Sequence, residues 1–257
     1  MNTKELTADD LLIGTLGERT IDSPLDPYFK RSGNEHAFYS DESRILVNHD
    51  LDDIRKMIKN DLEPACFEAA GPRRQSYFDP GETICAVVTC GGLCPGLNDV
   101  IRAIVMQACH RYGVPRVLGI PYGFEGLIPE YGHKLINLTP RFVSNIHQFG
   151  GTDIGTSRGP QDVSRMVDRL IELKINVLFV IGGDGSQRGG REIDAEARRR
   201  GYSLSVVGVP KTIDNDMIYM DKSFGYDTAC AAAVEAIKAA HTEARSVRNG
   251  IGLVKLM

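Results

Sequence analysis

The spacing of apolar residues divides this chain into two regions. Up to about residue 80 the sequence is mostly polar, with isolated prolines and few periodic apolar stretches. One short helix is predicted around residues 51–62, where apolar side chains recur on one face. We therefore expect residues 1–80 to form an extension that wraps the core or a neighbouring subunit; the alternative is a loosely ordered tail.

From Ile84 onward, strand-like and helix-like patterns alternate. Nearly continuous apolar runs of strand length occupy residues 84–90, 116–120, 175–183 and 204–210, and a last strand is predicted to begin at 250–256. Helical patterns occupy residues 98–112, 140–149, 160–174, 186–200 and 228–245, the last with Asp227 as its predicted N-cap. Apolar strands that alternate with helices predict an α/β fold, in which a parallel sheet is covered by helices on both faces.

The same pattern predicts the domain boundaries. Residues 71–82, rich in glycine, proline and charge, are typical of a linker. We expect an N-terminal extension over residues 1–80, an α/β domain over 81–225 and the start of a second domain over 226–257.

Composition narrows the class of protein. The 257 residues carry a formal net charge of -4 and no long basic run, which argues against a nucleic-acid partner. The N-terminus is polar and acidic, and no apolar run approaches the ~20 residues that span a bilayer. The six cysteines form no spaced framework, which favours a reducing compartment. These features predict a soluble, intracellular protein without a membrane partner.

Ligands of open α/β sheets bind at the carboxyl ends of the strands, so the loops that follow strands are the informative ones. The first, residues 89–98, reads TCGGLCPGLN. Its glycines let the backbone approach a ligand, and the helix that follows offers free N–H groups to a phosphate. Tight packing of the loop, with Cys90 and Cys94 as small packing residues, explains the same pattern.

A second loop, Gly182 to Gln187, follows the most apolar strand and reads GGDGSQ. Asp184 lies where a divalent cation would bridge its carboxylate to phosphate oxygens. A capping aspartate that opens the next helix is the alternative. The flanking glycines favour the metal hypothesis because they clear space for a ligand.

Two further loops carry charge. In Pro210 to Asp216, one of two carboxylates would take a proton from an attacking hydroxyl, and Lys211 would balance charge on a transferring phosphoryl group. The alternative is a solvated turn. In Gly155 to Pro160, Arg158 would hold a phosphate with two N–H groups, or it is an ordinary surface arginine.

Taken together, these loops resemble the phosphofructokinase family over about residues 84–257. The family shows a GG-x-x-PG-x-N loop, a GGDG loop and a TIDND loop in this order, which here begin at Gly91, Gly182 and Thr212. TIDND is highly specific, whereas GGDG also occurs in NAD kinases and lipid kinases. The sequence around these loops is most similar to the plant and kinetoplastid branch of the family. The segments concerned are GTSRGPQD, GGDGSQRGG and PKTIDND.

The resemblance implies roles for individual residues. Asp214 would be the general base for the sugar hydroxyl, assisted by Asp216, with Lys211 as a third catalytic residue. Asp184 would hold Mg²⁺. The implied nucleotide-binding residues are Gly92, Arg158, Gly183, Asp184, Gly185 and Ser186. The implied sugar-binding residues are Thr212, Ile213, Asp214 and Met257.

The resemblance also implies a glycolytic phosphotransferase with a Rossmann-like fold that converts fructose 6-phosphate and Mg-ATP to fructose 1,6-bisphosphate and ADP. Members that use pyrophosphate commonly carry an aspartate at the position of Gly185, which would repel the nucleotide. Gly185 therefore predicts ATP, although Lys211 is usual in pyrophosphate users; the plant and kinetoplastid ATP enzymes combine both features. The alternatives are a pyrophosphate-dependent enzyme and a non-catalytic nucleotide-binding subunit or sensor.

Family members continue beyond the position of Met257 into most of a second domain, which holds the sugar phosphate. We therefore expect this chain to contain most of the nucleotide-binding part of the active site and little of the sugar-binding part. By itself it is expected to be a poor catalyst. The resemblance further implies an allosteric homo-oligomer, commonly a tetramer, in the cytoplasm or in a peroxisome-type organelle, the glycosome.

Overall fold

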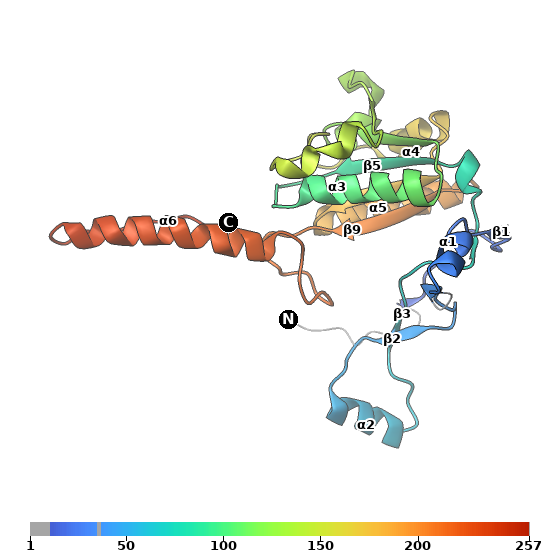
Figure 1. The fold of residues 1–257 in the computed structure, drawn as a ribbon, viewed down its shortest axis with the longest axis horizontal. Helices are drawn as coiled ribbons and strands as arrows, with labels where there is room; N and C mark the ends of the chain where they lie inside the picture. Colours follow the sequence, from blue (N-terminus) through green and yellow to red (C-terminus); the bar gives the residue numbers. More distant parts are fainter. Residues whose placement is uncertain (1–10, 35–36, 257) are drawn as a thin grey trace. The chain divides into compact units, whose positions relative to one another are not determined.

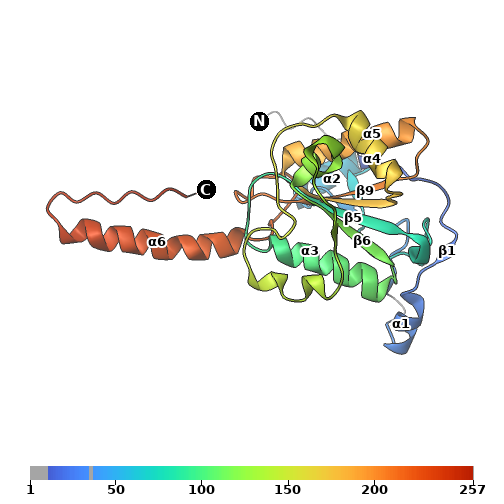
Figure 2. The same ribbon diagram turned by 90° about the horizontal axis from the view of Figure 1, so that it is seen from above.

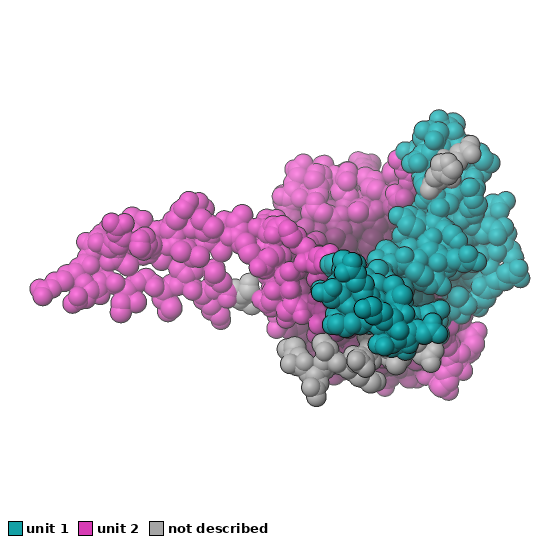
Figure 3. Space-filling view, turned by 90° about the horizontal axis from the view of Figure 1, so that it is seen from below, with its two compact units in different colours: residues 1–79 teal, residues 80–257 magenta. Residues whose placement is uncertain are grey.

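The structure is a computed structural model that describes residues 11–34 and 37–256. The chain divides into two compact units, Met1–Asp79 and Pro80–Met257 (Figure 3). Met257, one of the predicted sugar-binding residues, lies outside the described residues.

The first unit is built from short elements. Its helices are α1 (Asp26–Arg31) and α2 (Leu51–Lys59). Its strands form two antiparallel pairs, β1 (Ile21–Asp22) with β4 (Gln75–Ser76) and β2 (Arg44–Leu46) with β3 (Cys66–Glu68). Helix α2 forms inside the predicted range because the Asp50 carboxylate accepts the backbone N–H groups of Asp52 and Asp53.

The second unit holds a five-stranded sheet, of which β5 and β9 are labelled in Figure 1. The strand order is β7-β6-β5-β8-β9. The strands are β5 (Ile84–Thr89), β6 (Arg116–Ile120), β7 (Ile136–Asn137), β8 (Val177–Gly182) and β9 (Ser205–Pro210). Four of the five predicted strands pair in parallel, and β7 adds an antiparallel edge. The carboxyl ends of β5, β8 and β9 therefore lie next to one another at one edge.

Helices cover both faces of this sheet (Figure 2). They are α3 (Leu97–Met106), which continues into the π-helical turn η4 (Gln107–Arg111), α4 (Val163–Glu172) and α5 (Asp184–Arg199). Alternate residues of β5 point to opposite faces: Ala86 and Val88 pack with the side of α4 and α5, and Cys85 and Val87 with the side of α3. The predicted α/β architecture, a mostly parallel sheet between two helical layers, is confirmed.

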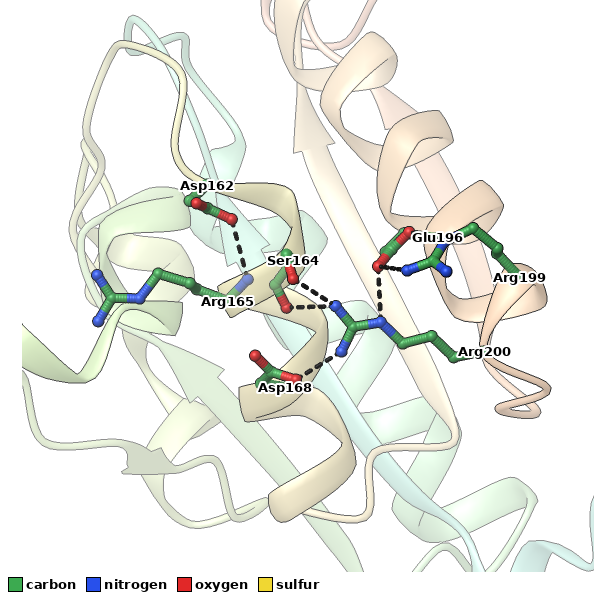
Figure 4. A network of polar contacts seen from close by, with 7 residues as sticks. All are labelled: Asp162, Ser164, Arg165, Asp168, Glu196, Arg199 and Arg200. Atoms are coloured by element: carbon green, nitrogen blue, oxygen red, sulfur yellow. Dashed lines mark hydrogen bonds and ion pairs between the residues drawn. The ribbon is translucent and has the colours of Figure 1, made fainter.

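A polar network ties α4 to α5 (Figure 4). Arg200 donates from Nη2 to the Ser164 hydroxyl at 2.6 Å and pairs through Nη1 with Asp168, while its Nε donates to Glu196 at 2.7 Å. Arg199 also donates twice to Glu196. These bonds hold the pKa of the Glu196 carboxyl down at about 2. The two helices that carry cavity residues are thereby fixed to each other.

Residues 140–149 do not form the predicted helix. They form two 3₁₀ turns, η7 (Phe142–Ser144) and η8 (Ile146–Gln148). Val143 and Ile146 are both buried, and their spacing of three residues matches the 3.0-residue turn of a 3₁₀ helix. Further 3₁₀ turns are η3 (Pro80–Glu82), η5 (Gly123–Leu127) and η6 (Pro129–Tyr131).

The C-terminal part also differs from the prediction. Helix α6 (Tyr226–Ser246) forms, but its N-cap is Gly225 rather than Asp227, whose carboxylate instead accepts from Lys222 at 2.8 Å. The strand predicted at 250–256 does not form: in the part of the chain that the structure describes, no strand pairs with these residues, and Ile251 and Leu253 are 93% exposed. None of the described residues of α6 is buried.

Within the described residues, the structure contains no helix with the length and apolar character needed to cross a membrane.

Candidate functional site

Two loops are joined by hydrogen bonds at the carboxyl edge of the sheet. The backbone N–H of Gly91 donates to the Ser157 carbonyl at 2.9 Å, and the Thr156 hydroxyl donates back to the Gly91 carbonyl at 2.8 Å. Thr89, the last residue of β5, is buried, and its hydroxyl donates to the Gly155 carbonyl at 2.6 Å. The loop after β5 and the loop that carries Arg158 are therefore held as one piece.

The same two segments are fixed a second time at the start of α3. The Asn98 side chain is 1% exposed, and its amide donates to the Phe149 carbonyl at 3.0 Å and to the Asp153 carboxylate at 3.1 Å. Its carbonyl accepts the Asp153 N–H at 2.9 Å. All the polar atoms of this buried side chain are satisfied, which explains why the loop ends in asparagine.

The loop after β8 reaches the same place. Helix α5 begins at Asp184, two residues earlier than predicted, with Gly183 as its N-cap. Gly182 leaves room for the Ser186 side chain, which a Cβ at position 182 would overlap. The Gln187 amide donates to the Gly182 carbonyl at 2.9 Å and to the Val209 carbonyl at 3.3 Å, linking the ends of β8 and β9.

These loops enclose a cavity of about 490 Å³. All six predicted nucleotide-binding residues line it: Gly92, Arg158, Gly183, Asp184, Gly185 and Ser186. The N-terminus of the 16-residue helix α5 thus opens on the cavity, where free backbone N–H groups and the positive end of the helix dipole favour an anion. A Cβ at Gly92 would lie 3.2 Å from Nη2 of Arg158, so glycine here leaves the guanidinium its space.

Some residues that line the cavity are not among those predicted from the sequence. They are Phe124, Gln161, Arg188 and Glu192, among others. Arg188 and Glu192 follow Asp184 at intervals of four residues, so they extend the same face of α5. Phe124 lies just after β6, and its place beyond a strand end was the available signal.

The donor set around Asp184 suits magnesium better than a structural metal. Asp184 is exposed, and no group of three or more potential metal ligands exists among the residues that the structure describes. Mg²⁺ commonly keeps several waters and takes only one or two carboxylates together with phosphate oxygens. A lone carboxylate at the edge of a cavity that opens on a helix N-terminus fits that mode of binding.

Lys211 lies beside the cavity but does not line it. The side chain is buried, the residue being 6% exposed, and Nζ donates to the Gly92 carbonyl at 2.6 Å. Burial lowers the pKa of this ammonium, and the charge of Arg158 acts in the same direction. Lys211 therefore anchors the glycine loop and places a second positive charge behind it.

The acidic segment after Lys211 is mainly tied to residues further along its own loop. The Thr212 hydroxyl donates to the Asp216 carboxylate, and the buried Ser223 hydroxyl donates to the Thr212 carbonyl. Asn215, in the left-handed region at φ 53°, accepts the Ser223 N–H at 2.6 Å. Asp214 and Asp216 are exposed and do not line the cavity. The structure thus groups the predicted nucleotide residues separately from the predicted catalytic carboxylates.

A parallel sheet with glycine loops and a cavity at its carboxyl edge is typical of α/β proteins that bind phosphate-bearing ligands. Comparison with known proteins gives the family: residues 84–257 match the family described as Phosphofructokinase, and the chain belongs to it. It is 43% identical over 256 residues to the ATP-dependent 6-phosphofructokinase of Trypanosoma cruzi, covering 98% of this chain and 52% of that protein.

It is also 52% identical over 233 residues to the ATP-dependent 6-phosphofructokinase 7 of Arabidopsis thaliana, covering 90% of this chain and 47% of that protein. The chain thus spans about half the length of the curated relatives it matches. Among solved structures, the pyrophosphate-dependent phosphofructokinase of Nitrosospira multiformis superposes with a TM-score of 0.56 at 22% identity, covering 64% of this chain and 42% of that one. That likeness concerns the fold.

Proposed function

We propose that this chain supplies the nucleotide-binding part of an ATP-dependent 6-phosphofructokinase. The observation that supports the proposal most strongly is that all six predicted nucleotide-binding residues line one cavity. The names of the relatives support ATP as the phosphoryl donor and fructose 6-phosphate as its acceptor.

In the proposed complex, the phosphates of ATP lie between the N-terminus of α5 and the guanidinium of Arg158. Gly92, Gly183 and Gly185 admit the phosphates close to the backbone, and Ser186 offers a hydroxyl. Charge-assisted hydrogen bonds from Arg158 stabilise the anion and fix its orientation. Such positioning matters most for phosphoryl transfer, where the protein contributes mainly geometry and charge neutralisation.

Asp184 is the proposed ligand of Mg²⁺, which when bound would neutralise charge on the phosphate oxygens. No neighbouring side chain competes for its carboxylate in the described contacts, and it belongs to the first turn of α5.

Asp214 is the proposed general base. Its carboxylate takes the proton of the sugar 1-hydroxyl as that oxygen bonds to the γ-phosphorus and the bond from phosphorus to ADP breaks. Asp216 assists nearby, and Lys211 acts from behind the glycine loop. Thr212, Ile213 and Met257 are proposed to contact the sugar, together with segments that the longer relatives carry.

By the same resemblance we propose a nucleotide-binding domain at 81–225, a substrate-binding domain starting at 226, and a homo-oligomeric, allosterically regulated enzyme in the cytoplasm or the glycosome. Sedimentation of a form with the full length of the relatives tests the oligomer, for which a tetramer is expected.

The test of the activity is formation of fructose 1,6-bisphosphate from fructose 6-phosphate and Mg²⁺, with ATP and pyrophosphate supplied in parallel. It is run on this chain and on a form with the full length of its relatives. Turnover with ATP in the longer form is expected. Turnover with pyrophosphate alone would contradict the role given to Gly185. No turnover with either donor would favour a non-catalytic nucleotide-binding subunit.

A further inference from the structure

The first unit contains a cavity of its own, of about 590 Å³, well removed in sequence from the loops described above. Three segments form its walls, within residues 15–19, 38–41 and 73–75. Its volume lies within the range of about 300–1,000 Å³ that is usual for small-molecule sites.

The walls are held in place by hydrogen bonds. The N–H of Ser23 donates to the Arg74 carbonyl at 2.8 Å beside the β1–β4 pair, and the N–H of Tyr39 donates to the Pro72 carbonyl at 2.9 Å. The ring of Tyr39 packs so closely on Gly71 that a Cβ there would overlap it. The cavity is therefore a built feature of the unit, since residues distant in sequence are fixed around it.

The cavity is lined by three arginines, Arg19, Arg73 and Arg74, against two carboxylates, Glu18 and Asp41. Asp41 joins two of the arginines: it forms an ion pair with Arg19 and another with Arg73, in which Nε of Arg73 lies 2.9 Å from the Asp41 carboxylate. Its side chain is 67% exposed, so an anion from solution can reach this position and compete with it.

One nitrogen of the Arg73 guanidinium has no hydrogen-bond acceptor among the residues that the structure describes. Its side chain is only 14% exposed, and its Nη2 donates to Glu68 at 3.0 Å and to the Ala69 carbonyl at 2.7 Å. Its Nη1 is buried without a hydrogen-bond partner. A buried guanidinium nitrogen without an acceptor is rare in folded proteins, and one explanation is an acceptor that a ligand brings.

We propose that this cavity binds a phosphate-bearing small molecule through Arg19 and Arg73. Paired guanidinium groups match the geometry of phosphate oxygens, and a tetrahedral anion offers more acceptors than the single Asp41 carboxylate that now lies between them. The ligand would displace Asp41 and supply the acceptor that Nη1 of Arg73 lacks.

The experiment titrates inorganic phosphate into the isotope-labelled chain at constant ionic strength, with chloride as the balancing anion, and follows backbone amides by NMR. The expected result is a saturable shift of the Ser40, Asp41 and Gln75 amides. Because phosphate would also enter the second unit's cavity, the Gly91 and Gly183 amides are followed separately in the same spectra. This separation keeps a result in one unit distinct from a result in the other.

Four variants sharpen the test. Arg19→Gln and Arg73→Lys are each expected to raise the Kd for phosphate by about tenfold, the loss of one charge-assisted hydrogen bond. Arg55→Gln, an exposed arginine of α2 away from the cavity, is the charge-matched control and should leave the Kd unchanged. Asp41→Asn should lower the Kd, because it removes the competing charge.

Unchanged amide positions in the β1–β4 pair show that a variant has kept its fold. The proposal is overturned by the absence of saturable shifts at Ser40, Asp41 and Gln75, or by equal weakening in Arg19→Gln and Arg55→Gln. It is also overturned if Asp41→Asn fails to tighten binding, since the arginines would then serve only to hold Asp41.

Discussion

The cavity loops and the acidic loop both follow strands of one sheet, but they are held in different ways. The loops at 89–98 and 152–160 are bonded to each other from different parts of the chain, through Thr89, Gly91 and Asn98. The acidic segment that begins at Thr212 bonds mainly within its own loop, and its carboxylates are exposed. The first region is fixed by hydrogen bonds between segments that are distant in the sequence, whereas the second presents exposed carboxylates on a loop that is bonded mainly to itself.

Lys211 belongs to both regions. It is the last buried residue before the acidic segment, and its ammonium holds the Gly92 carbonyl. The comparison therefore predicts that changes in the cavity loops affect nucleotide binding in this chain, while changes in the acidic loop affect turnover in a form with the full length of the relatives.

The largest expected effect is that of Asp214→Asn on turnover. Loss of a general base lowers kcat by roughly 10²–10⁴-fold. Steady-state kinetics of the longer form should show this fall, while calorimetry should show unchanged Mg-ATP affinity. Asp221→Asn, in the same loop, is the matched control. A kcat within a few-fold of the unmodified enzyme would refute the assignment of Asp214 as the base.

The second largest expected effect is that of Gly185→Asp on the affinity for ATP. A carboxylate a few Å from a phosphate costs on the order of 1–4 kcal/mol, so the Kd for ATP should rise at least about tenfold. Gly185→Asn has nearly the same size without the charge and should weaken binding less. Calorimetry with both variants decides the matter: equal weakening would mean that size, rather than charge repulsion, governs the site.

Gly182→Ala tests how tightly the cavity loops are packed. The added methyl group would overlap Ser186 and lie 3.2 Å from the Cys90 carbonyl, which should lower the free energy of unfolding by about 1–3 kcal/mol. Gly185→Ala, three residues further on, meets no atom within 4 Å. Denaturant unfolding should leave that control unchanged or slightly more stable, and equal losses in both variants would contradict the packing described here.

The smallest expected effect concerns Glu196. Its pKa is held down at about 2 by Arg199 and Arg200, below the ordinary value of 4.5. A carboxyl with a lowered pKa in the folded state adds stability above its ordinary pKa and loses it as pH falls toward 2. Glu196→Gln should therefore flatten the loss of thermal stability between about pH 4.5 and 2. Glu235→Gln on α6 is the control, and identical pH profiles for both variants would contradict the role of the network.

Much of this arrangement could be predicted from the sequence, because parallel strands buried on both faces leave continuous apolar runs. Strand β6 begins and ends where its pattern predicts, and the glycine loops mark the cavity wall. The contacts between segments distant in the sequence could not be predicted from the local sequence pattern. Val143 and Ile146 share a helical face in sequence, yet they are buried from two separate 3₁₀ turns. The bond from Lys211 to Gly92 joins residues 119 positions apart, so no local pattern reveals it.

The strand predicted at 250–256 failed for a different reason. Its alternating apolar residues have β propensity, but a strand forms only where another backbone supplies hydrogen bonds, and a sequence pattern does not say which segment will do so. The cavity in the first unit was missed because its arginines come from separate segments that look like ordinary surface sequence.

The central claim is that the loops around Gly92, Arg158 and Gly183 bind the phosphates of ATP. The most direct measurement is a crystal structure of this chain with Mg²⁺ and a slowly hydrolysed ATP analogue. Phosphate density is expected against the N-terminus of α5, within hydrogen-bonding distance of the Arg158 guanidinium. Phosphates bound elsewhere on the chain, with this cavity empty at saturating nucleotide, would contradict it.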